Sequence, residues 1–262
     1  MDFGLSGKRA LVTAASRGLG LGIATALAGE GAHVLISGRS ADKLKAAAEE
    51  ITAKGPGKAD YVTVDLTAGD AADALVTASQ DILGGVDILV NNTGGPPPGR
   101  MVDADMDVLA AQFDPMVLTV IKLTQKLVGP MRAQGWGRVI TVASSGVIQP
   151  IPNLGLSNTL RSALVGWSKS MSNDVAADGV TVNMLLPGRI HTERVDELDT
   201  AASNRSGQSM DDVRAASRAT IPAGRYGTVE EFAAVAAFLA SVPASYVTGS
   251  LVRCDGGSIK SV

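Results

Sequence analysis

Short apolar runs alternate with stretches of helical length along almost the whole chain. The apolar runs are Arg9–Thr13, His33–Ser37, Tyr61–Val64, Val86–Val90, Arg138–Val142, Val180–Leu185 and Ser250–Arg253. The helical stretches between them are Gly20–Ala28, Asp42–Ala53, Ala71–Leu83, Asp105–Met131, Ser157–Ala177 and Val229–Leu239. Strands that are separated by helices are joined by right-handed crossovers, which make neighbouring strands parallel. The alternation therefore predicts an α/β fold in which helices cover both faces of a parallel sheet, a three-layer αβα arrangement.

Three segments interrupt this alternation. Pro115 lies inside the longest helical stretch and predicts a kink or break, because proline removes a helix hydrogen bond. Gly94–Gly99 reads GGPPPG and predicts a rigid loop after the fourth strand. Thr192–Ile221 is polar and charged, and we expect it to be partly helical and to form a lid over a site. Because no linker or repeat divides the chain, we expect residues 1–262 to form a single domain.

Charge, hydropathy and cysteine content exclude several classes of function. The formal net charge of −3 provides no basic surface for nucleic acid or for an anionic membrane. No apolar run approaches the roughly 18 residues that a membrane helix needs, and the N-terminus does not resemble a signal peptide. The single cysteine, Cys254, excludes an internal disulfide, and no His, Asp or Glu cluster suggests a metal. We therefore expect a cytoplasmic protein without a metal, a membrane contact or a nucleic-acid partner.

The turn after the first strand is the sharpest local motif. Thr13–Gly20 reads TAASRGLG, follows a predicted strand and opens a predicted helix. Glycines at such a turn let the backbone approach a pyrophosphate, and the free N–H groups of the helix N-terminus favour an anion. The alternative is a tight strand–helix turn that binds nothing, since glycine-rich turns are common. The motif nevertheless predicts a Rossmann-type doubly wound sheet with a nucleotide site.

Further motifs resemble those of the short-chain dehydrogenase/reductase family. Thr13–Gly20 resembles the family's TGxxxGxG turn, with Ala14 in place of the first glycine. Asn91–Gly94 resembles its NNAG motif, and Pro187-Gly188 with Thr192 resembles its PGxxxT segment. Val64-Asp65 and Tyr246–Gly257 resemble the adenine-side pair and the C-terminal strand and turn. The resemblance covers nearly the whole chain, extends to 3-oxoacyl-carrier-protein reductases and related ketoreductases, and implies a dinucleotide cofactor. The residues that it implies for cofactor binding are Thr13, Ser16, Arg17, Gly18, Leu19, Gly20, Arg39, Asp65, Leu66, Asn92, Gly94, Pro187, Gly188, Ile190 and Thr192.

The residues after the second strand bear on the choice of cofactor. NAD preference usually needs a carboxylate there, which accepts a hydrogen bond from the ribose 2′-OH. Ser37–Ser40 contains none. Arg39 and Arg17 could instead flank a 2′-phosphate, because guanidinium groups bind phosphate well, although both could simply be solvated. We therefore expect NADP as the preferred cofactor, with NAD possible.

The catalytic motif is where the resemblance fails. Family members use a serine, a tyrosine and a lysine, supported by an asparagine on the preceding long helix. When the chain is aligned from the strand Arg138–Val142 onward, the serine falls on Ser144, the tyrosine on Ser157 and the lysine on Arg161. The asparagine position falls on Met116. The resemblance thus implies a catalytic set of Ser144, Ser157 and Arg161, with only the serine retained.

These replacements change the route by which a proton can travel. The hydroxyl of Ser157 is a far weaker acid than a phenol, and Arg161 does not readily release a proton. Loss of a positioned general acid typically costs about 10²–10⁴ in rate. His191 titrates near neutrality and lies in the nicotinamide-side segment, so it is a candidate donor, with a solvent-facing loop histidine as the alternative.

Two functions compete, and a third, a non-redox enzyme such as a lyase or isomerase, has no specific support in the sequence. The first is an NAD(P)-dependent oxidoreductase, NADP-preferring, that acts on a small carbonyl or alcohol substrate with an altered proton-transfer set. The alternative is a catalytically weak nucleotide-binding protein, a sensor or a partner subunit on the same fold. The resemblance also implies a homotetramer, to which the helix Ser157–Ala177 and the segment after Ala244 would contribute.

Overall fold

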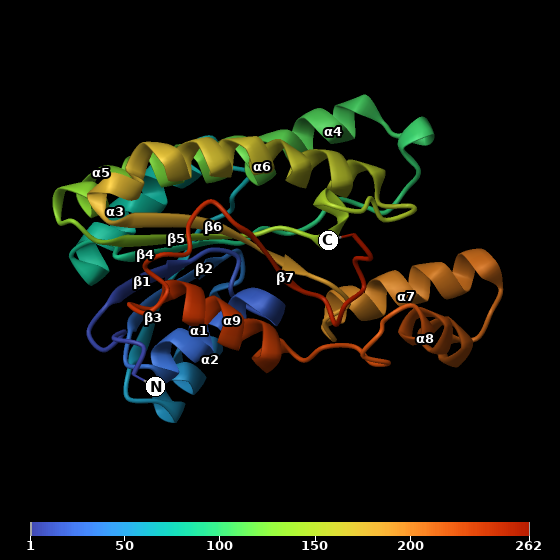
Figure 1. Ribbon diagram of the computed structural model, residues 1–262, viewed down its shortest axis with the longest axis horizontal. Coiled ribbons are helices and arrows are strands. Elements are labelled where there is room, and N and C mark those ends of the chain that lie inside the picture. Colours follow the sequence, from blue (N-terminus) through green and yellow to red (C-terminus); the bar gives the residue numbers. More distant parts are fainter. Residues whose placement is uncertain (1, 262) are drawn as a thin grey trace.

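The computed structural model describes residues 2–261, which contain one seven-stranded parallel sheet (Figure 1). The strand order is β3-β2-β1-β4-β5-β6-β7. The first three strands are therefore added toward one edge of the sheet and the last four toward the other, so the order reverses between β1 and β4. This order confirms the predicted doubly wound Rossmann-type sheet. The strands are β1 Arg9–Val12, β2 His33–Gly38, β3 Lys58–Thr63, β4 Ile88–Asn91, β5 Gly137–Val142, β6 Val180–Pro187 and β7 Leu251–Cys254.

Helices cover both faces of the sheet, as the sequence predicts. Figure 1 shows α1, α2 and α9 on one face and α3, α5 and α6 on the other. Successive side chains of β1 point to opposite faces of the sheet. Leu11 packs into one core cluster, and Ala10 and Val12 pack into the other. The helices bordering the sheet are α1 Gly18–Gly29, α2 Ala41–Lys54, α3 Ala71–Leu83, α5 Thr119–Ala133, α6 Gly155–Val175 and α9 Val229–Ala240, while α4 Met106–Phe113 packs against α6.

The long helical stretch before β5 is interrupted where the sequence predicts. Between α4 and α5 lies a π-helical segment, η2 Asp114–Leu118, with Pro115 near its start. Proline has no N–H to donate, so a hydrogen bond of the α-helical ladder is missing at this position. The interruption points Met116 inward, where its side chain is buried.

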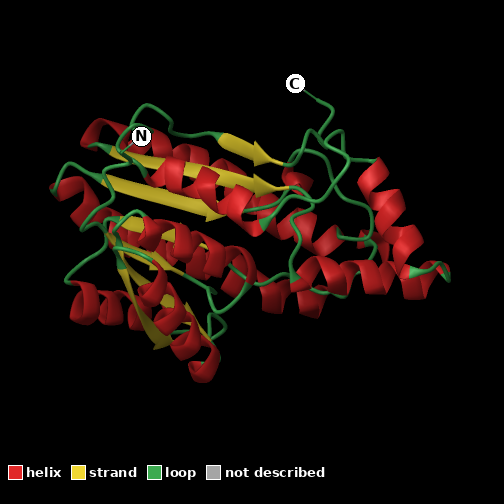
Figure 2. Ribbon diagram, turned by 90° about the horizontal axis from the view of Figure 1, so that it is seen from below, coloured by secondary structure: helices red, strands yellow, loops and turns green. Residues whose placement is uncertain are grey.

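The segment expected to form a lid folds as two helices, α7 Glu193–Ser206 and α8 Met210–Ala219. They lie beyond the carboxyl ends of the strands, the end of the sheet toward which the arrows point in Figure 2. Many of the loops gather at the same end. Asp199 of α7 is fully buried and pairs with Arg189, whose Nη1 lies 2.9 Å from Oδ1. Its other oxygen accepts a hydrogen bond from the hydroxyl of Tyr226 at 3.0 Å. Asp199 therefore ties α7 to the segments that leave β6 and enter α9.

Removing this carboxylate is expected to loosen the two helices. Asp199→Ala leaves the guanidinium of Arg189 and the hydroxyl of Tyr226 without their partner, which we expect to lower the free energy of unfolding by about 3 kcal/mol. Urea denaturation measures the change. Asp81→Ala, at an exposed position of α3, is the control and should stay within about 0.5 kcal/mol of the parent protein. Equal stability of the two variants would contradict this account of the Asp199 contacts.

Candidate active site

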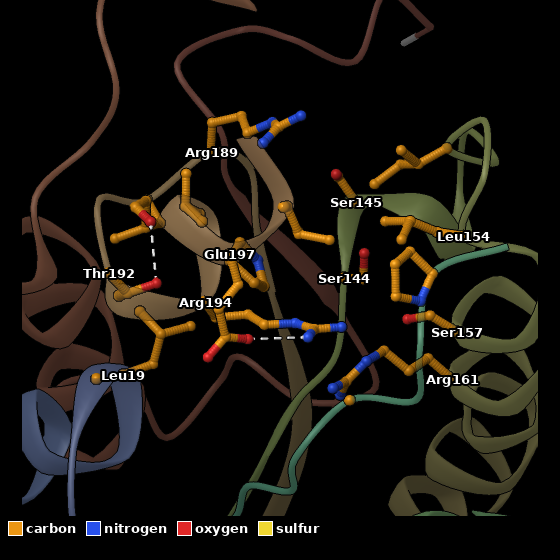
Figure 3. Close-up of a pocket in the computed structure, with 18 of the residues that line it drawn as sticks. Leu19, Ser144, Ser145, Leu154, Ser157, Arg161, Arg189, Thr192, Arg194 and Glu197 are labelled. Atoms are coloured by element: carbon orange, nitrogen blue, oxygen red, sulfur yellow. Dashed lines mark hydrogen bonds and ion pairs between the residues drawn. The ribbon is translucent and has the colours of Figure 1, made fainter. Parts of the chain in front are cut away.

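A cleft of about 1580 Å³ opens at the carboxyl ends of the central strands, beside the point where the strand order reverses. Ligands of doubly wound sheets bind at this position. The cleft exceeds the roughly 300–1,000 Å³ of ordinary small-molecule pockets, so it has room for a dinucleotide together with a substrate. Its walls are the turn after β1, the loop after β4, the ends of β5 and β6, the start of α6, and the helix α7 (Figure 3).

Most of the residues predicted to bind a cofactor line this one cleft. They are Ser16, Arg17, Gly18, Leu19, Arg39, Asp65, Leu66, Asn92, Gly94, Pro187, Gly188, Ile190 and Thr192. Thr13 and Gly20 lie behind its surface instead, as supports. The hydroxyl of Thr13 donates to the carbonyl oxygen of Asn92 at 2.7 Å and accepts from the N–H of Asn92 at 2.9 Å. This exchange fixes the turn after β1 to the end of β4.

The glycine-rich turn has the form of an anion cradle. Gly18 opens α1 at φ +59°, a conformation that glycine adopts freely. Ala14 adopts φ +48°, the left-handed region that favours glycine, at the position where the resemblance expects one. The amide of Asn92 donates to the carbonyl oxygen of Ala14 at 3.0 Å and so holds this conformation. No side chain caps the N-terminus of α1, which leaves its first N–H groups available to a phosphate.

The two arginines predicted to contact a 2′-phosphate differ in their surroundings. Arg39 is exposed and forms no ion pair within the described residues 2–261. Its charge contributes to the lowered pKa of the nearby Asp65, whose main cause is the N–H of Thr67. Arg17 is already engaged, because its guanidinium contacts Glu193 and lies 3.8 Å from Glu197, both on α7. Arg39 is therefore the freer of the two for an anionic ligand.

The three residues of the predicted catalytic set face the same cleft. Ser144 follows β5, and its Oγ accepts a hydrogen bond from the N–H of Gly146 at 3.0 Å. Ser157 and Arg161 are one helical turn apart on α6, so they share a face of that helix. Met116 also lines the cleft, from η2. Figure 3 shows both serines and the guanidinium of Arg161 around a shared space.

Arg161 is held as a cation by backbone oxygens. Its Nη1 donates to the carbonyl oxygen of Val142 at 3.0 Å, and its Nη2 donates to that of Gly94 at 3.2 Å. Burial, together with the charge of the neighbouring Arg194, lowers the pKa of Arg161 to about 10, so the side chain stays protonated at neutral pH. Within the described residues 2–261 it forms no ion pair with a carboxylate. Its charge is therefore available to a negative group in the cleft.

No phenol or imidazole is among the side chains that line the cleft within residues 2–261. Tyr226 bonds to the buried Asp199, and burial raises the pKa of its phenol. His191 lies outside the cleft with 64% of its side chain exposed, 3.5 Å from Asp196. The structure thus places this histidine as the solvent-facing loop residue that the sequence left as the alternative to a proton donor.

The structure adds residues that the sequence motifs do not indicate. Arg194 of α7 reaches across to the loop after β4, where its Nη2 donates to the carbonyl oxygen of Pro96 at 2.8 Å. The loop from Gln149 to Leu154 and the C-terminal Ser258–Lys260 complete the far wall. These segments carry no motif, and only the positive charges of Arg194 and Lys260 and the place of the segments after predicted strands hint at a role.

Residues 2–261 contain neither a cluster of potential metal ligands nor a membrane-spanning helix. No three His, Cys, Asp or Glu side chains gather in a way that could hold a metal ion. No helix in this part of the chain is both long enough and apolar enough to cross a membrane.

Comparison with known proteins gives the family. Residues 13–258 match the family model described as enoyl-(acyl carrier protein) reductase. The chain is 31% identical to the NADPH-dependent reductase BacG of Bacillus subtilis, over 98% of this chain and 100% of that one. It is 34% identical to the 3-oxoacyl-(acyl-carrier-protein) reductase FabG of Vibrio cholerae, over 97% and 98%. Its structure superposes on all of the L-sorbose reductase of Gluconobacter frateurii, solved with NADPH and L-sorbose, with a TM-score of 0.94 and 32% identity. The chain therefore belongs to the short-chain dehydrogenase/reductase family and is an NAD(P)-dependent oxidoreductase resembling the 3-oxoacyl-carrier-protein reductases.

Proposed function

We propose that the protein is an NADP-preferring reductase of a small carbonyl compound, with a proton-transfer set that differs from the family's. The observation that carries this proposal is the pairing of an intact anion cradle with Ser144 and Arg161 in one cleft. The names of the relatives support NADP, since BacG is called NADPH-dependent and the L-sorbose reductase was solved with NADPH.

The residues of the cleft fit this cofactor. The N–H groups at the start of α1 would receive the pyrophosphate, because no side chain caps them. The unpaired Arg39 would receive the 2′-phosphate, and Asp65 with Leu66 would border the adenine. The nicotinamide would lie toward Pro187, Gly188, Ile190 and Thr192, with α7 and α8 as a lid over the substrate.

The chemistry follows from the side chains around the reacting carbonyl. When bound, NADPH supplies a hydride to the carbonyl carbon, and the electron pair of the C=O bond moves to oxygen. The hydroxyl of Ser144 would donate a hydrogen bond to that oxygen, and the charge of Arg161 would stabilise the negative charge that develops there. Because the hydroxyl of Ser157 is a very weak acid and Arg161 keeps its charge to stabilise the developing negative charge, the proton would come from water. Ser157 would hydrogen-bond to that water from the same wall of the cleft.

Two assays test this function. NADPH and NADH binding is measured by nucleotide fluorescence, and NADPH oxidation is then followed with ketones, 3-oxoacyl thioesters and quinones. Turnover with any of these supports the proposal. Nucleotide binding without turnover on the whole panel would instead favour a catalytically weak sensor or partner protein, the candidate that the missing phenol supports.

Arg39 is expected to set the preference for NADP. Arg39→Gln removes a guanidinium that has no ion pair within residues 2–261, and we expect NADPH binding to weaken about tenfold to a hundredfold, because a charge-assisted phosphate contact is lost. NADH, which lacks the 2′-phosphate, should bind as before. Arg17→Gln is the matched comparison and should have a smaller effect on NADPH, since Glu193 already engages Arg17. Equal losses for NADPH and NADH would place Arg39 away from the 2′-phosphate.

Ser144 is expected to hold the substrate oxygen. Removing a hydrogen-bond donor from a developing oxyanion lowers kcat by about 10²–10³, and we expect Ser144→Ala to have an effect of this size on NADPH oxidation. The affinity for NADPH should stay close to that of the parent protein. If Ser144→Ala leaves the activity untouched, the reacting carbonyl does not lie beside β5.

We also propose a homotetramer, as the family resemblance implies. Tyr246, in the segment after α9, is fully exposed in the single chain, and β7 is an edge strand of the sheet. Burial of both against a second copy would remove an unpaired edge. Light scattering coupled to size exclusion measures the mass directly.

A further inference from the structure

Two arginines from different elements meet at the loop Gly94–Gly99. Arg161 of α6 donates to the carbonyl oxygen of Gly94, and Arg194 of α7 donates to that of Pro96. The three prolines of this loop have no N–H, so at these positions the backbone offers only acceptors. The loop is therefore suited to hold cations. It binds two guanidinium groups through carbonyl oxygens that lie two residues apart in the sequence. Figure 3 shows both groups reaching into the cleft, Arg161 from the side of Ser157 and Arg194 from the opposite wall.

The positive charge of this pair is only partly neutralised. Arg194 has one carboxylate partner, Glu197, at 3.1 Å, and Glu197 also lies 3.8 Å from Arg17. Arg161 forms no ion pair within residues 2–261, and burial, followed by the proximity of Arg194, lowers its pKa. Two like charges at close range repel, and an anion between them would relieve the repulsion.

The rest of the substrate half of the cleft also has more cations than anions, although Glu193 and Glu197 of α7 line it as well. Arg205 of α7 and Lys260 near the C-terminus line it and form no ion pair within the described part of the chain. The chain as a whole has a net charge of −3, so this local excess of cations is not a property of the entire surface. A cleft with an excess of one sign of charge concentrates ligands of the opposite sign.

We propose that the substrate is a 2-oxo acid whose carboxylate is bound by Arg161 and Arg194. This inference rests on the proposed reductase function and names the substrate class for the same site. Guanidinium groups bind carboxylates with strong, charge-assisted hydrogen bonds, and Arg161 retains three of its five N–H donors after its two backbone contacts. A 2-oxo acid has its keto oxygen and carboxylate on adjacent carbons, so Arg161 can contact both. Hydride addition to C2 and a proton from water at oxygen give the 2-hydroxy acid and NADP⁺.

Binding to the enzyme–NADP⁺ complex tests the inference without requiring turnover. The probes are a homologous series of 2-oxo acids and, for each acid, the uncharged 2-oxo amide of similar shape, titrated by calorimetry. We expect the best acids to bind at least about tenfold more tightly than their amides. Arg161→Gln and Arg194→Gln should each abolish most of this preference. Arg100→Gln is the control for charge, since Arg100 follows the same loop but lies outside the cleft, and it should keep the preference.

The outcomes separate the substrate class from the function. Acids that bind no more tightly than their amides, or a preference that survives both arginine substitutions, would overturn the carboxylate site. If NADPH is oxidised equally well with neutral ketones and with 2-oxo acids, the reductase function stands and the carboxylate inference fails. If the acids bind with the expected preference but no compound on the panel is reduced, the carboxylate site stands and the reductase function fails.

Discussion

The double variant Ser157→Tyr/Arg161→Lys is expected to reduce neutral ketones about 10²–10⁴-fold faster than the parent protein. Both positions lie on one face of α6 and line the cleft, so a phenol at 157 and an ammonium at 161 would face the reacting carbonyl together. The phenol, with an ordinary pKa of about 10 that a nearby ammonium lowers, then supplies the general acid that the native pair lacks. The measurement is kcat/KM for NADPH oxidation with an uncharged ketone.

The single variants show whether the gain has this cause. Arg161→Lys alone adds no phenol at position 157 and should give little of the gain, whereas Ser157→Tyr alone should give part of it. The double variant should also lose the preference for 2-oxo acids over their amides, because the guanidinium at 161 is gone. If the double variant binds NADPH normally yet shows no gain on any ketone, Ser157 and Arg161 do not occupy the positions of the family's tyrosine and lysine.

Gly20→Val is expected to abolish NADPH binding, with at least a hundredfold loss of affinity. A Cβ at this position would lie 2.7 Å from Nδ2 of Asn92 and 2.8 Å from the carbonyl oxygen of Ala14, closer than real Cβ atoms approach. The turn would have to move away from β4, and the free N–H groups of α1 would leave their present orientation. Fluorescence titration with NADPH measures the loss.

A second glycine of the same helix provides the control. Gly29 ends α1, and a Cβ built there meets no atom within 4 Å, so Gly29→Ala should bind NADPH as the parent protein does. Circular dichroism checks that both variants fold. Unchanged affinity in a folded Gly20→Val protein would show that the turn after β1 is not the pyrophosphate site.

Much of the fold could be predicted because the pattern of apolar residues and the effect of proline on a helix both act locally in the sequence. The apolar runs became the seven strands with boundaries that differ by three residues or fewer, since a buried parallel strand needs a short, continuous apolar sequence. Pro115 marked the interruption between α4 and α5 for an equally local reason, the missing N–H. The order of the strands in the sheet depends on contacts between distant segments, and it was predictable only through the glycine-rich turn and its resemblance.

The candidate site likewise contains residues that sequence motifs predict and residues that only the folded chain brings together. The turn after β1 and the end of β4 carry recognisable motifs, because backbone geometry there requires glycine and asparagine. Arg194 carries none, and its role depends on the path of α7 across the cleft. The engagement of Arg17 by Glu193 and the bonds of Arg161 to backbone oxygens are likewise set by the folded chain. A sequence does not display which carbonyl groups will face a guanidinium.

The central claim is that the nucleotide site is intact although the family's proton donor has been replaced. Titration of the unmodified protein with NADPH and with NADH, followed by nucleotide fluorescence, tests it most directly. We predict saturable binding of NADPH, about tenfold or more tighter than binding of NADH. Failure of both nucleotides to bind, or tighter binding of NADH, would contradict the account.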